Sequence, residues 1–133
     1  MNAFTYYMPA KVFFGKDCIM NNKEAFLPLG KKALIFTGRH SAKINGSQKD
    51  IENALDAVGI GHVLFDEVEE NPSLETIERA AKIGLSVGVD FVIGIGGGSP
   101  MDAAKGASYL IANPSMSADM LMQEGQYRHT PIV

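Results

Sequence analysis

The fold of this chain is decided by the stretch Asp90-Phe91-Val92-Ile93-Gly94-Ile95-Gly96-Gly97-Gly98-Ser99-Pro100-Met101-Asp102. It begins with a short apolar run, continues through three consecutive glycines and ends in residues that can open a helix. A short apolar run bounded by glycine is typical of a buried strand, and strands followed by helices are the repeating unit of parallel α/β proteins. We therefore predict a strand over 90–95 and a helix from Ser99 to about Ala112.

Three glycines leave the turn between this strand and this helix without side chains. The backbone at Gly96, Gly97 and Gly98 can then adopt positive φ and approach a ligand closely. Ser99 is a favourable N-cap, and Asp102, three residues on, can complete a capping box. A helix that begins there points its free N–H groups toward the glycines, which favours binding of an anion, most naturally a pyrophosphate.

The turn follows neither of two common phosphate-binding patterns. Counted from Gly94 or from Gly96, the third glycine of G-x-G-x-x-G is missing, and no Gly-Lys-Ser/Thr follows for a Walker A loop. A tight, well-capped turn without a ligand is therefore the alternative. Glycine costs about 1 kcal/mol per residue relative to alanine, so a triple glycine at the carboxyl end of a strand favours a ligand.

The alternation of strand and helix extends upstream. Strands are predicted over 32–37 and 62–68, helices over 47–58 and 74–87, and a further strand is predicted to open at 130–133. Ser47 with Asp50 resembles a capping box, and Ser73 can cap the second helix after an Asn71-Pro72 turn. Short connections between such units imply a doubly wound, Rossmann-like α/β fold, with a parallel sheet covered by helices on both faces.

The N-terminal part of the chain departs from this repeat. Tyr6-Tyr7-Met8 and Val12-Phe13-Phe14 are expected to form either a hairpin or two extended segments. Asp17 can cap a helix that ends at about Leu27. The predicted fold therefore carries an N-terminal extended segment in front of its sheet.

Length and composition indicate an ordinary globular protein. Of the 133 residues, 46% are hydrophobic and 20% are charged. The length suits one domain, and we predict a single dinucleotide-binding domain over 1–133, with 1–30 as a strand and helix extension and 31–133 as the βαβ core. A net charge of −3 gives no electrostatic reason to bind nucleic acid or an anionic membrane.

The sequence carries no sign of export or of membrane insertion. No apolar run approaches the ~20 residues that a membrane span needs, and the first residues lack the basic start and apolar core of a signal peptide. Cys18 is the single cysteine, so an internal disulfide is excluded. We therefore expect a cytoplasmic protein.

The glycine turn and three other segments resemble a known family. Residues 96–105 match the signature GGGSxxDxAK at every defined position, and Phe91-Val92-Ile93-Gly94-Ile95 is similar to the strand that precedes that signature. Asn71-Pro72 and Phe13-Phe14-Gly15 resemble a turn and an N-terminal strand of the same family. From about residue 4 to residue 133, the chain resembles the group III, iron-activated alcohol dehydrogenases.

The resemblance implies a site for a nicotinamide dinucleotide. In it, Gly97, Gly98 and Ser99 contact the pyrophosphate, and Gly96 belongs to the same cofactor-binding turn. Asp102 lies near the nicotinamide ribose and the substrate entrance, and Asn71 lies on the adenine side. The implied reaction is hydride transfer between NAD(P) and a small alcohol or aldehyde. In the full-length enzyme, an Fe²⁺ ion would polarise the substrate oxygen.

One departure from the family favours NADP over NAD. Relatives that use NAD often carry Asp directly after the threonine that ends the first strand, where it binds the adenosine ribose. Here Gly38 takes that position, Arg39 follows, and Ser41 and Lys43 are close in sequence. A missing carboxylate removes repulsion against a 2′-phosphate, and arginine binds phosphate well. The alternatives are NAD as the cofactor and a purely solvated Arg39.

A second departure concerns the metal. The family's iron ligands, one Asp and three His, come from a downstream helical domain that is not in this sequence. The histidines present are His40, His62 and His129, which are scattered and lack the spacing of a metal site. We therefore assign no metal ligand, and we expect this chain alone to have no dehydrogenase activity, even with added iron.

Two other functional classes compete with an enzyme. A non-catalytic, flavodoxin-like binding module usually carries acidic residues at its strand ends, whereas this chain has Thr37-Gly38 and Ile95-Gly96 there. A purely structural or interaction domain would use the aromatic residues near the N-terminus, Tyr6, Tyr7, Phe13 and Phe14, to pair with a partner. That pairing is also compatible with the enzyme, as a homodimer through the N-terminal strand.

Overall fold

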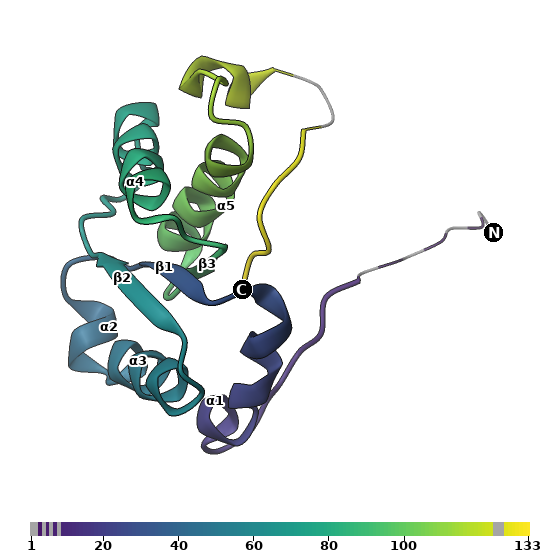
Figure 1. Ribbon diagram of the computed structural model, residues 1–133, viewed down its shortest axis with the longest axis vertical. Helices are drawn as coiled ribbons and strands as arrows, with labels where there is room; N and C mark the ends of the chain where they lie inside the picture. The colour runs from purple at the N-terminus through teal and green to yellow at the C-terminus, as the bar shows by residue number, and fades with distance from the viewer. Residues whose placement is uncertain (1–2, 4, 6, 8, 124–126) are drawn as a thin grey trace.

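A computed structural model of the chain describes residues 3, 5, 7, 9–123 and 127–133 (Figure 1). Strands and helices alternate along most of it. In chain order the elements are α1 (Cys18–Asn21), the 3-10 helix η1 (Lys23–Leu29), β1 (Lys32–Phe36), α2 (Ser41–Ile44), α3 (Ser47–Ala57), β2 (Gly61–Phe65), α4 (Leu74–Val87), β3 (Phe91–Gly94), α5 (Gly98–Ala112) and the 3-10 helix η2 (Ala118–Met122).

The three strands form a parallel sheet in the order β2-β1-β3. Leu34 of β1 lies opposite Val63 of β2 and Val92 of β3, so β1 is the central strand. Residues 33–36 of β1 are fully buried, as a continuous apolar run predicts for a strand covered on both faces. A parallel bridge between Val92 and Ile132 adds the predicted C-terminal extended segment beside β3.

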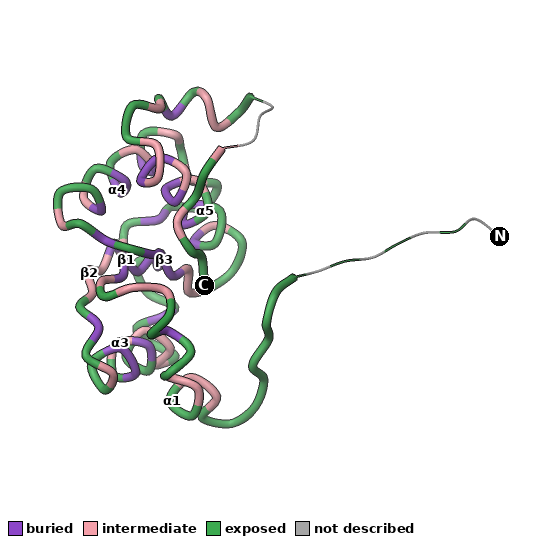
Figure 2. The backbone as a smooth tube through the Cα atoms, turned by 45° about the vertical axis from the view of Figure 1, so that its right-hand side comes forward, coloured by how far each residue is buried: buried purple, intermediate pink, exposed green. Residues whose placement is uncertain are grey.

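Helices cover both faces of this sheet, with α4 and α5 on one face and α2 and α3 on the other (Figure 1). Successive side chains of a strand point to opposite faces. Ala33 and Ile35 therefore pack in one buried cluster with residues of α3, whereas Leu34 and Phe36 pack in another with residues of α4 and α5. Figure 2 shows the buried residues concentrated on the strands and on the helix sides that face them. The predicted doubly wound α/β fold is confirmed.

Helix α4 begins and ends as its sequence predicts. The Ser73 side chain accepts a hydrogen bond from the backbone N–H of Thr76 at 3.2 Å, which satisfies one of the free donors of the first turn. Gly88 ends the helix in the left-handed conformation, with φ at 77°. In the described part of the chain, no helix combines the length and the apolar character that crossing a membrane requires.

The start of α3 differs from the prediction. Gly46, at a φ of 84°, is its N-cap, and no side chain caps the helix. The hydroxyl of Ser47 donates to Oδ1 of Asn45 at 2.7 Å instead, so the capping box with Asp50 is wrong. The short helix α2 precedes α3 and is not predicted by the sequence, because four residues are too few to show a helical period.

Two short helical pieces replace the single helix predicted from Asp17 to about Leu27. Asp17 has a φ of 55° and makes no side-chain cap, and Asn22 separates α1 from η1. Residues 9–14 form neither helix nor strand, and Phe14 is fully exposed. This segment runs away from the folded body, green throughout in Figure 2. The predicted strand at 6–8 includes Tyr6 and Met8, which lie outside the described residues.

Candidate functional site

The strand order β2-β1-β3 places a topological switch point between β1 and β3. The connection from β1 to β2 runs over one face of the sheet, and the connection from β2 to β3 crosses to the other face. The backbone N–H of Ile95 donates to the carbonyl of Phe36 at 2.9 Å, so the two strands leave the sheet side by side. In open α/β sheets, ligands bind outside the carboxyl ends of strands at such a switch point.

Two glycines around this edge are required by the fold itself. A Cβ added at Gly94 would lie 3.1 Å from Cα of Met101, so only glycine lets α5 approach β3 this closely. Gly96 has a φ of 129°, and its added Cβ would lie 3.2 Å from the ring of Pro100. Packing and backbone geometry therefore explain why these positions hold glycine.

Gly97 and Gly98 have no such explanation. Gly97 is extended, with φ at −79° and ψ at −157°, and the prediction of positive φ holds for Gly96 alone in the triple glycine. A Cβ added at either residue would meet nothing within 4 Å. Neither the backbone conformation nor any neighbouring atom therefore demands glycine at these two positions.

Helix α5 begins two residues earlier than predicted, because its N-cap is not Ser99. Gly97 is its N-cap, Gly98 is its first residue, and no side chain caps it, so the capping box of Ser99 and Asp102 is wrong. Ser99 lies inside the first turn, where its Oγ accepts a hydrogen bond from the backbone N–H of Asn71 at 3.2 Å. Without a side-chain cap, the first N–H groups of α5 stay available to an anion.

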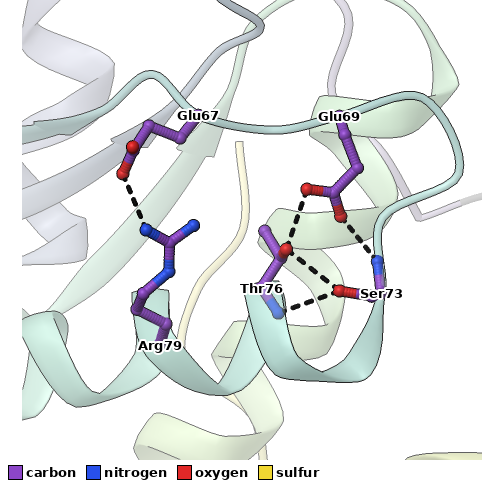
Figure 3. A network of polar contacts seen from close by, with 5 residues as sticks. All are labelled: Glu67, Glu69, Ser73, Thr76 and Arg79. Atoms are coloured by element: carbon purple, nitrogen blue, oxygen red, sulfur yellow. Dashed lines mark hydrogen bonds and ion pairs between the residues drawn. The ribbon is translucent and has the colours of Figure 1, made fainter.

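Asn71 belongs to the loop between β2 and α4, which a cluster of side-chain contacts holds in place (Figure 3). Glu69 accepts from the backbone N–H of Ser73 at 2.7 Å and from the hydroxyl of Thr76 at 2.8 Å. These two bonds, in that order, lower the pKa of Glu69 below its ordinary value of 4.5. Asn71 has a φ of 51°, so the loop turns sharply toward Ser99.

A second contact braces the same loop. Arg79 of α4 donates to Glu67 at 3.0 Å (Figure 3). The same guanidinium lies over the ring of Phe65, 5.3 Å from its centroid. Sequence reasoning missed Glu67 and Glu69, because acidic residues in a loop are most often solvated and no fixed spacing marks them. Their contacts come from α4 folding back under the loop.

The residues predicted to read the adenosine ribose lie at the carboxyl end of β1. Thr37 is buried, and its N–H donates to the carbonyl of Phe65 at 3.0 Å. A Cβ added at Gly38 would meet only the carbonyl of Val68, at 3.8 Å, so nothing in the fold demands glycine there. Arg39 and Ser41 are both exposed, with Ser41 opening α2.

Lys43 of α2 forms an ion pair with Asp66, the residue that follows β2. This hydrogen bond is the largest cause that lowers the pKa of Asp66 below its ordinary value of 3.8. Sequence reasoning missed Asp66, because its partner Lys43 lies on α2, a helix too short to show a helical period.

The remaining candidates are spread over the surface. Asp102 is exposed on α5, one turn beyond Ser99. His62 contacts Asp56 at 2.8 Å, and His129 lies edge-on to Tyr109. Among the residues that the structure describes, no three His, Cys, Asp or Glu side chains converge as metal ligands. These residues therefore do not fit an iron site.

Several known proteins are similar to this chain in sequence and in fold. The sequence model of the family described as iron-containing alcohol dehydrogenase matches residues 9–133. NADH-dependent butanol dehydrogenase B of Clostridium acetobutylicum is 38% identical over 102 residues, covering 77% of this chain and 26% of that protein. NADPH-dependent butanol dehydrogenase of Clostridium saccharobutylicum is 32% identical over 114 residues, covering 86% of this chain and 29% of that protein.

A solved structure has the same arrangement of elements. The crystal structure of an iron-containing alcohol dehydrogenase from Thermotoga maritima superposes with a TM-score of 0.91 at 38% identity. The match covers 98% of this chain and 36% of that one. The chain thus spans between 26% and 36% of the length of these three relatives.

Proposed function

This chain belongs to the iron-containing alcohol dehydrogenase family, and we propose that it is the dinucleotide-binding part of an enzyme that oxidises alcohols or reduces aldehydes. The nicotinamide ring of the bound dinucleotide gives or takes the hydride. Residues of this chain bind and orient that cofactor. The support is the open glycine turn at the switch point of the sheet, where Gly97 and Gly98 have no structural reason to be glycine.

The pyrophosphate is held by the start of α5. Backbone N–H groups at Gly98 and Ser99 point out of the first turn, while Pro100 contributes none. The Ser99 hydroxyl already accepts a hydrogen bond from Asn71, so its own hydrogen is free to donate to a phosphate oxygen. Asp102, one turn along the same helix, is proposed to lie near the nicotinamide ribose.

NADP is the proposed cofactor, in preference to NAD. The relatives include proteins named for each cofactor, so family membership alone does not decide between them. Gly38 leaves the end of β1 without a carboxylate, and the exposed Arg39 and Ser41 follow it. Arginine and hydroxyl groups suit a 2′-phosphate, which an aspartate at Gly38 would repel.

A titration with the fluorescence of NADPH tests the dinucleotide proposal. The variants are Gly97→Val at the turn and Gly61→Val at the opposite edge of the sheet, where an added Cβ makes only ordinary contacts, the nearest at 3.7 Å. Gly97→Val should weaken binding more than about tenfold, while Gly61→Val should leave it unchanged. Equal binding by wild type and Gly97→Val, or no binding by the wild type, would refute the proposal.

The N-terminal segment supports a further proposal, a homodimer. Val12 and Phe14 are 71% and 100% exposed, and neighbouring exposed apolar side chains often mark a protein–protein contact. Light scattering on the wild type and on Phe14→Ser tests it, and a monomeric wild type would contradict it. The cytoplasmic location and the single domain over 1–133 stay predictions of the sequence.

A further inference from the structure

The carboxyl ends of β1 and β2 lie next to each other, and both carry charged residues. Phe36 pairs with Phe65 in the sheet, and beyond it the N–H of Val68 donates to the carbonyl of Thr37 at 3.2 Å. The loop that starts at Gly38 and the loop that starts at Asp66 therefore leave the sheet together. An adenosine ribose that binds at Gly38 would therefore also lie near Asp66.

Lys43 reaches this edge from α2. Its ammonium contacts Oδ2 of Asp66, and the side chains are 44% and 35% exposed. Arg39 makes no ion pair within the described residues, yet its charge is among the causes that lower the pKa of Asp66. A half-exposed pair contributes little to stability. The effect of the Lys43–Asp66 pair is local, because the pair determines whether the Asp66 carboxylate is unpaired at this edge of the sheet.

The two candidate cofactors respond to such a carboxylate in opposite ways. The 2′-phosphate of NADP carries more than one negative charge at neutral pH, so a carboxylate beside it is repulsive. The ribose hydroxyls of NAD are donors, and a carboxylate within reach of them can accept their hydrogen bonds. Lys43 cancels the charge of Asp66 and occupies one of its oxygens.

We infer that Lys43 is a specificity-determining residue that acts through Asp66. Their ion pair neutralises the carboxylate at the end of β2, so that a 2′-phosphate can bind beside it without repulsion. This inference rests on the proposed dinucleotide site. Removing Lys43 exposes the Asp66 carboxylate to the ribose and to Arg39. The preference should then move from NADP toward NAD, although neither residue lies on the glycine turn.

Four proteins separate an action through Asp66 from direct phosphate binding by Lys43. They are the wild type, Lys43→Gln, Asp66→Asn and the double variant, each titrated with NADPH and with NADH by cofactor fluorescence. The expected result is a roughly three- to tenfold fall in the NADPH to NADH affinity ratio for Lys43→Gln. In the double variant the ratio should return to within about twofold of Asp66→Asn alone.

A matched control variant shows whether the loss of any exposed, paired lysine has the same effect. Lys82→Gln removes the same charge from another exposed ion pair, with Glu78 on α4, and should not change the ratio. An unchanged ratio in Lys43→Gln overturns the inference. So does an equal fall with and without Asp66, which would mean that Lys43 binds the phosphate itself. If the wild type binds neither cofactor, the dinucleotide proposal fails, and this inference fails with it.

Discussion

The backbone N–H of Asn71 donates a hydrogen bond to Oγ of Ser99 at 3.2 Å, across 28 residues of sequence. The bond ties the loop after β2 to the first turn of α5. It also sets the direction of the Ser99 hydroxyl, because an oxygen that already accepts from one side turns its hydrogen elsewhere. Two loops that meet at the carboxyl edge of the sheet are thereby held in one arrangement.

Ser99→Ala should weaken dinucleotide binding without unfolding the protein. The change removes a donor to the pyrophosphate, which is worth roughly 1–2 kcal/mol, or about five- to thirtyfold in affinity. Cofactor fluorescence gives the affinity, and thermal unfolding shows that the fold is kept. Ser86→Ala is the control, since Ser86 is an exposed helical serine whose hydroxyl donates to the carbonyl of Ile83. Equal effects of both changes would contradict the assigned role.

Asn71 should tolerate glycine and resist branched residues. Its φ of 51° lies in the left-handed region, which asparagine and glycine adopt readily and β-branched residues do not. Asn71→Gly should change the free energy of unfolding by less than about 0.5 kcal/mol, and Asn71→Val should lower it by about 1–2 kcal/mol. Chemical denaturation measures both. Similar losses in the two variants would show that this loop relaxes out of the left-handed conformation.

Glu69 should stabilise the fold in a pH-dependent way. Its folded pKa lies below the unfolded value of 4.5, so its contribution is present above pH 4.5 and is lost as the pH falls through the folded pKa. At pH 7, Glu69→Gln should lower the free energy of unfolding by about 0.3–1 kcal/mol, the usual range for an anion at a helix N-terminus.

Denaturation curves of both proteins between pH 7 and pH 3 check this prediction for Glu69. The difference between wild type and Glu69→Gln should shrink below pH 4.5. The neighbouring, exposed Glu70 provides the comparison, because Glu70→Gln should cost little at any pH. A difference that stays constant down to pH 3 would mean that Glu69 acts by packing and not by charge.

Gly38→Asp should reverse the cofactor preference. An aspartate fits without strain, since the added Cβ meets only the carbonyl of Val68 at 3.8 Å. The new carboxylate repels a 2′-phosphate and accepts from ribose hydroxyls, so NADPH affinity should fall by about tenfold while NADH affinity holds or improves. Gly61→Asp, at the other edge of the sheet, should alter neither. Unchanged affinities in Gly38→Asp would show that this position does not contact the ribose.

Most of the fold could be predicted from local patterns. The run of four buried residues in β1 marks a strand with both faces covered, and Ser73 and Gly88 mark the two ends of α4. Each of these signals lies within a few residues of the feature that it specifies. The exact starts of α3 and α5 were harder to predict. Serine is a favourable N-cap residue, yet the N-caps are Gly46 and Gly97 and not Ser47 and Ser99.

The candidate site was predictable only in part, because its contacts join distant segments. The glycine turn is visible in the sequence, whereas the contact of Asn71 with Ser99 depends on how two loops meet. The pair of Lys43 and Asp66 likewise requires α2, a helix too short to leave a periodic pattern. Residue type suggests a candidate for such roles, and only the fold brings the partners together.

The missing side chain at Gly94 has a consequence for how quickly a ligand can be captured. Because α5 rests directly on β3, with only 3.1 Å left for a Cβ beside Cα of Met101, its first turn is fixed to the central sheet. Donors that are already in position need not be ordered when a dinucleotide arrives, so little conformational entropy is lost on binding. Association should therefore proceed in a single fast phase, with no slow rearrangement after the encounter.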